Sequence, residues 1–323
     1  MRVLNSLLFF LSLTLFACGE APAPVPPPAT TPPPAKAKKV RIGLIMKTLT
    51  NPYFIKMEKG ARKAETELGI ELIVRTGTQE TSFEHQVAIV DDLVEKRLVD
   101  ALVLAPADSW HLIASVKKAR EAGIPVVNVS TRLDPKALAE IGCQNIPLVS
   151  VNNEQGAYLS AKALVADVKA PSKAMILEGI RQADSAEQRK QGARRAFAEN
   201  PAVSLVASET ANWKIDEAYD VTKKTLLAHP DISLIFAAND MMALGAIKYL
   251  RDTEKKNVKV AGFDALTEAL QAIKAGEMAA TLDQQGDEQG YQGVQYAVRL
   301  LKGETLPAET LLEVKLITAD NVP

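Results

Sequence analysis

The sequence has almost no net charge and no long apolar run outside its N-terminal segment. Its 38 basic residues are offset by 39 acidic ones, which leaves a net charge of −1, and no basic stripe stands out. Nucleic-acid binding relies on positive charge gathered on one surface, so nucleic acid is excluded as an expected partner. Beyond the N-terminal segment, no apolar run approaches the roughly 20 residues that a membrane helix needs.

Catalytic motifs are missing as well. The three histidines, His85, His111 and His229, are expected on helices or in a helix-terminal turn, and none has metal-ligand spacing. The chain contains no GxSxG elbow, P-loop or GxGxxG fingerprint. Cys143 lies in the stretch IGCQN, which offers no nearby base to activate its thiol. We therefore predict that the protein is not an enzyme and uses neither a metal nor a cofactor.

The N-terminal segment has the layout of an export signal. A basic residue follows Met1, residues 7–15 are mostly apolar, and a small residue precedes Cys18. This pattern predicts a signal peptide over residues 1–17, because the apolar stretch is too short to span a bilayer. A cysteine directly after the cut resembles the lipobox of bacterial lipoproteins, which implies lipidation of Cys18. The alternative is an ordinary signal peptide that happens to contain a cysteine.

A proline-rich segment follows, and we assign residues 18–39 to the lipidated cysteine and a tether. From Ala21 to Lys39 the chain holds eight prolines, no glycine and no large apolar residue except Val25. Such a segment cannot bury a core and is expected to be a stiff, extended spacer. A peptide ligand for a partner groove is the alternative, but the position after an anchor favours a tether. These features predict a lipoprotein in the periplasm or at the cell surface, attached to a membrane only through its lipid.

The remainder alternates short β-branched runs with amphipathic helical stretches. Apolar strands are expected at residues 40–46, 70–74, 101–105, 125–129, 148–151, 173–178, 203–207, 233–237, 258–262 and 279–282. Helices fit the segments between them, the last near residues 286–301. This alternation predicts parallel sheets covered by helices on both faces. The strand number favours two sheets of five or six, so we expect an α/β protein with two similar doubly wound lobes.

Polar and aromatic side chains gather where the predicted strands end, which is the edge at which such sheets bind ligands. Asn51 follows the first strand and Ser130 follows the fourth. The other candidates in these loops are Tyr53, Phe54, Arg132, Arg189, Trp213, Asn239, Phe263, Asp264 and Gln284. Sugar hydroxyls both donate and accept hydrogen bonds, and the C–H faces of a sugar ring pack on aromatic rings. The loops therefore predict a sugar or polyol ligand, although asparagine and aspartate are also favoured in turns and caps.

Five stretches of the sequence resemble the ribose/galactose-type periplasmic binding proteins, which are the pentose and hexose receptors of ABC importers. They are TLTNPYF, ANW followed by LLAHPDI, FAANDMMALGA, VAGFDA and AATLDQ, and they occur in order between about Val40 and Leu316. The resemblance implies two lobes that are joined by three crossings and close on one monosaccharide. It places the crossings near residues 151–152, 284–285 and 313–314. The N-terminal lobe would then comprise residues 40–151 and 285–313, and the C-terminal lobe residues 152–284 and 314–323.

The resemblance also assigns ligand contacts. Asn51, Tyr53 and Phe54 would come from the N-terminal lobe. The C-terminal lobe and hinge would supply Arg189, Trp213, Asn239, Asp264 and Gln284, with Phe263 stacking on the sugar.

Three departures argue against ribose itself. Ribose receptors have an Asp-Arg pair where this chain has Ser130 and Thr131, with Arg132 one place later. Glu187 stands where they have an arginine, and Lys47 replaces a small hydroxyl residue. Lys47 is either solvated at the mouth of the cleft or in contact with the ligand.

The resemblance implies that a membrane permease of an ABC transporter receives the ligand. A receptor that presents its ligand to a chemotaxis or sensor-kinase protein is the alternative, since it differs only in its outer surface. Repressors with the same two lobes carry a helix-turn-helix head where this chain has an export signal and prolines. A monomer is expected.

Overall fold

The computed structural model describes residues 39–323, together with Ser12 and Gly19. The predicted signal peptide, the lipidation site Cys18 and the tether up to residue 38 lie outside the described residues. Across the described part of the chain, every helix is too short or too polar to serve as a membrane span.

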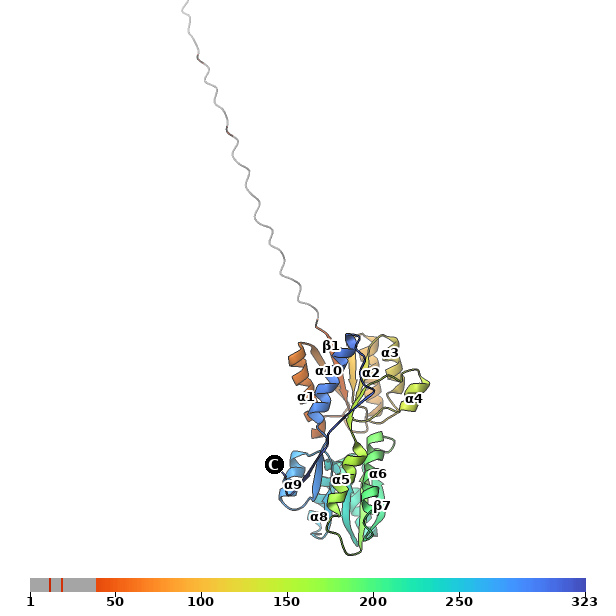
Figure 1. The fold of residues 1–323 in the computed structure, drawn as a ribbon, viewed down its shortest axis with the longest axis vertical. Coiled ribbons are helices and arrows are strands. Elements are labelled where there is room, and N and C mark those ends of the chain that lie inside the picture. Colours follow the sequence, from red (N-terminus) through yellow and green to blue (C-terminus); the bar gives the residue numbers. More distant parts are fainter. Residues whose placement is uncertain (1–11, 13–18, 20–38) are drawn as a thin grey trace, which may run out of the picture. The chain divides into compact units, whose positions relative to one another are not determined.

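The first of two six-stranded sheets has the strand order β11-β5-β4-β3-β1-β2, with every pairing parallel. Its strands are β1 (Arg41–Met46), β2 (Glu71–Thr76), β3 (Ala101–Leu104), β4 (Val126–Val129), β5 (Leu148–Val151) and β11 (Glu309–Leu312). Helices α1 (Pro52–Leu68) and α10 (Gly286–Leu301) pack together against one face. Helices α2 (Phe83–Glu95) and α3 (Ile113–Glu121) cover the other, and the short α4 (Pro135–Glu140) follows β4 (Figure 1).

The second sheet has the order β12-β10-β9-β8-β6-β7, in which only β12 runs antiparallel to its neighbour. Its strands are β6 (Ser172–Glu178), β7 (Val203–Thr210), β8 (Ile232–Ala237), β9 (Lys259–Ala261), β10 (Ala280–Asp283) and β12 (Lys315–Thr318). Helices α5 (Asn153–Leu164) and α6 (Asp184–Ala198) form one layer. Helices α7 (Ile215–Ala228), α8 (Asp240–Asp252) and α9 (Thr267–Lys274) form the other.

The prediction of two doubly wound lobes is confirmed. Strands β3, β4 and β5 are buried along their whole length, as expected of parallel strands covered on both faces. The start of α1 is encoded locally, because the Asn51 side chain accepts a hydrogen bond from the Tyr53 N–H at 3.0 Å and Pro52 occupies the first turn. The same helix ends at Gly69, whose positive φ of 65° suits glycine.

The chain passes between the two sheets three times. It leaves the first sheet after β5 to form α5, returns after β10 to form α10, and crosses again between β11 and β12. Parallel strands bring their carboxyl ends to one edge of a sheet, and loops from this edge of both sheets line a common cavity.

Candidate ligand-binding site

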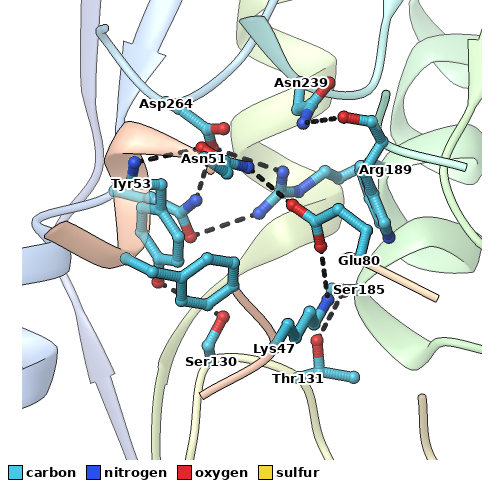
Figure 2. A pocket seen from close by; sticks show the side chains of 13 residues that line it. Lys47, Asn51, Tyr53, Glu80, Ser130, Thr131, Ser185, Arg189, Asn239 and Asp264 are labelled. Carbon is cyan, nitrogen blue, oxygen red and sulfur yellow. Dashed lines mark hydrogen bonds and ion pairs between the residues drawn. The ribbon is translucent and has the colours of Figure 1, made fainter. Parts of the chain in front are cut away.

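A small cavity lies between the two lobes. The first lobe contributes Lys47, Asn51, Tyr53, Phe54, Glu80, Ser130 and Thr131 (Figure 2). The second lobe and the hinge contribute Ser185, Arg189, Trp213, Asn239, Asp264 and Gln284.

The guanidinium of Arg189 occupies the centre of the second-lobe wall. Its Nε donates to Asn153 Oδ1 at 2.9 Å, and its Nη1 donates to the Ala238 carbonyl at 2.8 Å. Its Nη2 donates to Gln284 Oε1 at 3.2 Å, and its Nη1 lies 3.6 Å from Asp264 Oδ1. These contacts from four segments hold the guanidinium plane in one orientation, which is what directional recognition of a ligand requires.

Asp264 lies beside Arg189 and is equally enclosed. Gln284 Nε2 donates to its Oδ1 at 2.5 Å. Burial raises the pKa of Asp264, although the attraction to Arg189 opposes this shift. Burial also lowers the pKa of Arg189. A carboxyl group in this setting gains from any ligand hydroxyl that donates a hydrogen bond to it.

The first-lobe wall is built around Asn51 and Tyr53. Asn51 Nδ2 donates to Glu80 Oε1 at 2.8 Å, while its own oxygen caps α1. The Tyr53 hydroxyl lies 3.2 Å from Ser130 Oγ and 3.1 Å from the Oε1 of Gln289, a buried residue of α10 behind the wall. Burial raises the pKa of Tyr53, so its hydroxyl remains protonated.

Several wall residues have positive backbone φ angles, which residues other than glycine rarely adopt. The φ angles of Ser130, Trp213 and Asp264 are 65°, 67° and 126°. Such conformations cost on the order of 1–3 kcal/mol each, and they persist at ligand sites where packing enforces them. Close packing fixes the position of the Trp213 ring, because a Cβ added to Gly179 would come within 2.1 Å of it.

Two buried polar atoms of the wall have no hydrogen-bond partner among the described residues. They are Glu80 Oε2 and Trp213 Nε1. Buried polar atoms in native proteins are almost always paired, so unpaired ones that line a cavity point to a ligand.

All but two of the predicted contact residues line the cavity. Arg132 does not, because its guanidinium extends outward to Glu309 and lies 3.7 Å from Asp184. Phe263 is fully buried behind the wall, where the Arg189 guanidinium covers it at 3.7 Å from the ring centroid. Phe263 thus supports Arg189 and has no surface on the cavity. For the residues that do line it, contact with a ligand remains a prediction.

The structure also adds residues to the predicted set. Lys47 lines the cavity with its side chain only 5% exposed, so the alternative of a solvated lysine at the mouth is wrong. Glu80 and Ser185 were not predicted. Glu80 stands in the loop after β2, and Ser185 lies in the first turn of α6. The loop after β2 was the signal that could have revealed Glu80.

A two-lobed body with a small polar cavity lined by both lobes is typical of the solute-binding proteins that close around a ligand. The model of the periplasmic binding protein domain family matches residues 42–305. The chain belongs to this family, and within it to the ribose/galactose type that its motifs resemble. The family acts outside the cytoplasm.

Individual relatives are similar over nearly the whole described chain. The D-ribose/D-allose-binding protein of Pseudomonas aeruginosa is 37% identical over 83% of this chain and 84% of its own length. The ribose import binding protein RbsB of Salmonella typhimurium is 32% identical over 86% of this chain and 90% of its own. A solute-binding protein of an ABC transporter from Actinobacillus succinogenes, solved with D-allose, is 37% identical, with a TM-score of 0.82 over 87% of this chain and 98% of its own. These relatives are binding proteins, which confirms the prediction of a binding protein rather than an enzyme.

Proposed function

We propose that this protein captures one neutral monosaccharide, or a polyol of similar size, by closing its lobes and delivers it as a monomer to the permease of an ABC importer. The observation that carries the proposal is the cavity between the lobes, whose wall combines amide, carboxylate and guanidinium groups with three aromatic side chains. A hydroxyl buried without a partner costs about 1–3 kcal/mol, so a polyhydroxylated ligand needs this density of polar groups.

The charges of the wall favour a ligand without net charge. Lys47 and Arg189 are balanced by Glu80 and Asp264. A sugar acid or an amino sugar would therefore leave one buried charge without a counterpart, which is costly in a site of low dielectric.

Contacts across the rim support capture by closure. Lys56 Nζ in α1 donates to the Ala265 carbonyl of the second lobe at 2.7 Å. The Asp184 N–H in α6 donates to Ser109 Oγ of the first lobe at 3.0 Å. A ligand held by both lobes favours the closed form because only that form offers all its contacts. Shifting the closed-to-open ratio from 1:99 to 99:1 requires about 5.5 kcal/mol of such preference.

A thermal-shift screen of residues 39–323 against pentoses, hexoses, deoxy sugars, polyols and inositols tests the ligand class. A ligand at a hundredfold excess over its Kd is expected to add roughly 2.7 kcal/mol of stability. No shift with any carbohydrate, with the protein folded, would contradict the proposal.

We further propose that Cys18 carries a lipid and that the proline-rich segment keeps the receptor close to the permease. The layout of residues 1–39 supports this proposal. Membrane fractionation of the full chain and its Cys18→Ser variant tests it, and retention of the variant in the membrane fraction would speak against the anchor.

A further inference from the structure

The first turn of helix α6, which belongs to the second lobe, contacts the first lobe at three points outside the hinge crossings. The Asp184 N–H donates to Ser109 Oγ at 3.0 Å, and Ser109 Oγ in turn donates to the Arg132 carbonyl at 2.7 Å. Ser185 Oγ lies 3.1 Å from Thr131 Oγ1, and Arg132 Nε lies 3.7 Å from Asp184 Oδ2. The first-lobe partners stand in the loops after β3 and β4, so these contacts form only while the two lobes meet.

The guanidinium of Arg132 lies between two carboxylates that belong to different lobes. Its Nη2 donates to Glu309 Oε1 in β11 of the first lobe, and its Nε faces Asp184 of the second. Asp134, which caps α4 in the first lobe, adds a further negative charge near Asp184. Without the arginine, two first-lobe carboxylates would face Asp184 across the lobes and repel it.

The charges around Asp184 act on it with opposite signs. Burial raises the pKa of Asp184, the carboxylates of Glu309 and Asp134 raise it further, and Arg132 opposes them. The side chains of Arg132, Asp184 and Glu309 are 29%, 32% and 38% exposed, so solvent screens their charges in part. The contribution of each charge to closure is therefore modest but has a definite sign. The arginine favours the closed form, and the glutamate opposes it.

This charged cluster lies outside the ligand cavity. Arg132, Asp184 and Glu309 line a separate groove beside the first hinge crossing, whereas their neighbours Thr131 and Ser185 line the cavity. Lobe opening would separate Asp184 from Arg132 but would keep Arg132 with Glu309, because the latter two residues share a lobe. The attraction between Arg132 and Asp184 therefore favours closure whether or not a ligand is bound.

We propose that Arg132 is a latch that holds the lobes of the ligand-free protein together. Part of the ligand-free population is then closed, and a residue that never touches the ligand helps to set its affinity. This inference rests on the proposed function, because it concerns the closure by which that function captures a ligand.

Small-angle scattering of ligand-free residues 39–323, which form one compact unit, measures the closed-to-open ratio without any sugar. Arg132→Gln is expected to lower this ratio by about threefold, as expected for a partly exposed ion pair. Glu309→Gln is expected to raise the ratio, because it removes a carboxylate that repels Asp184 and frees the guanidinium to approach it.

Salt provides a second test, which the unaltered protein can answer alone if Arg132→Gln does not fold. Raising sodium chloride from about 0.1 M to about 1 M shortens the screening length from about 10 Å to about 3 Å. The ratio of the unaltered protein is expected to fall, because screening weakens the attraction between Arg132 and Asp184. In Arg132→Gln the ratio is expected to rise instead, because screening weakens the repulsion that remains.

Arg195→Gln is the matched control. It removes an arginine of the same helix whose 2.6 Å ion pair with Glu154 stays within the second lobe, so its ratio and salt response are expected to match those of the unaltered protein. An entirely open ligand-free protein, or an unchanged ratio in Arg132→Gln, would overturn the latch while leaving sugar capture intact. A lower ratio in Glu309→Gln would overturn it too. A failed carbohydrate screen would instead contradict the sugar ligand and leave the latch standing.

Discussion

At the residue scale, Trp213 is a residue whose role the sequence could suggest but whose orientation only the fold determines. Its aromatic identity and its place after β7 predicted a role in binding. Its orientation depends on its left-handed backbone and on Gly179, which leaves no room for a methyl group beside the ring. The sequence contains both residues, but nothing in it shows that they touch.

We expect Gly179→Ala to weaken ligand binding by at least about tenfold, equivalent to about 1.4 kcal/mol. The added Cβ would lie 2.1 Å from the nearest ring atom of Trp213, so the indole must move out of the cavity wall. Calorimetry with the ligand found by screening measures the effect.

Gly69→Ala is the matched control for this variant. Gly69 also has a positive φ, but a Cβ there would meet nothing within 4 Å. We expect it to lower the free energy of unfolding by about 1 kcal/mol and to leave affinity unchanged. Unchanged affinity in folded Gly179→Ala would show that Trp213 has no part in binding.

At the element scale, the passage from β10 to α10 connects the hinge to the cavity. Gln289 in α10 donates from Nε2 to the Gln284 carbonyl at 2.7 Å and accepts from the Tyr53 hydroxyl at 3.1 Å. The Gln284 side chain in turn contacts Asp264 and Arg189. One buried side chain outside the cavity wall thus joins the hinge backbone to both walls.

We expect Gln289→Met to lower affinity by roughly tenfold, because the Gln284 carbonyl loses its partner and an unpaired buried group costs about 1–3 kcal/mol. Small-angle scattering at saturating ligand is expected to show a larger open fraction than in the unaltered protein. The same substitution at Gln292, a partly exposed residue of α10, is expected to change neither quantity. A lower melting temperature without a change in affinity or open fraction would assign Gln289 a purely structural role.

The strands that the sequence predicted differ from those that it did not. Most of the ten predicted strands were predictable because burial on both faces imposes continuous apolar runs, whereas the edge strands β2 and β7 are only partly buried. Strands β11 and β12 are only partly buried. Exposed and half-buried residues occur side by side in both, so neither has a continuous apolar run. Their pairing with β5 and β10 depends on contacts distant in sequence, so periodicity could not reveal them.

At the scale of the whole molecule, Asp240 makes stability depend on pH. It is fully buried at the start of α8, where it accepts hydrogen bonds from the Leu266 N–H at 2.9 Å and the Thr281 hydroxyl at 2.7 Å. Burial raises its pKa from 3.8 to about 6. The folded state therefore holds a proton between about pH 4 and pH 6 that the unfolded state has released.

We expect the stability contributed by this proton to be complete below the unfolded pKa and to be lost as pH rises through about 6. Asp240→Asn cannot ionise and removes this decline, which amounts to about 1 kcal/mol or more because one pKa unit corresponds to about 1.4 kcal/mol. Urea unfolding at pH 4, 5, 6 and 7 checks the expectation. Asp216→Asn, at an exposed position in α7, is expected to follow the unaltered protein. Parallel stability curves for Asp240→Asn and the unaltered protein would contradict it.

The sequence predicted which loops form the candidate site, but it could not predict which of their side chains face the cavity. Polar residues at strand ends identified most of the wall, since parallel sheets bring those ends together. Whether a side chain in such a loop faces the cavity depends on how the two lobes meet. This explains why Lys47 is buried beside Glu80, and why Arg132, which is next in sequence to a wall residue, points away.

The enclosure of the cavity also separates how tightly a ligand is held from how fast it leaves. Wall residues of both lobes, such as Asn51 and Arg189, are each 4% exposed, so a molecule seated between them is covered from both sides. Exit must wait for a domain movement, which in proteins takes microseconds to milliseconds. The residence time of the ligand is then set by the rate of lobe opening, and a partner that opens the lobes releases the ligand by separating the two halves of the site.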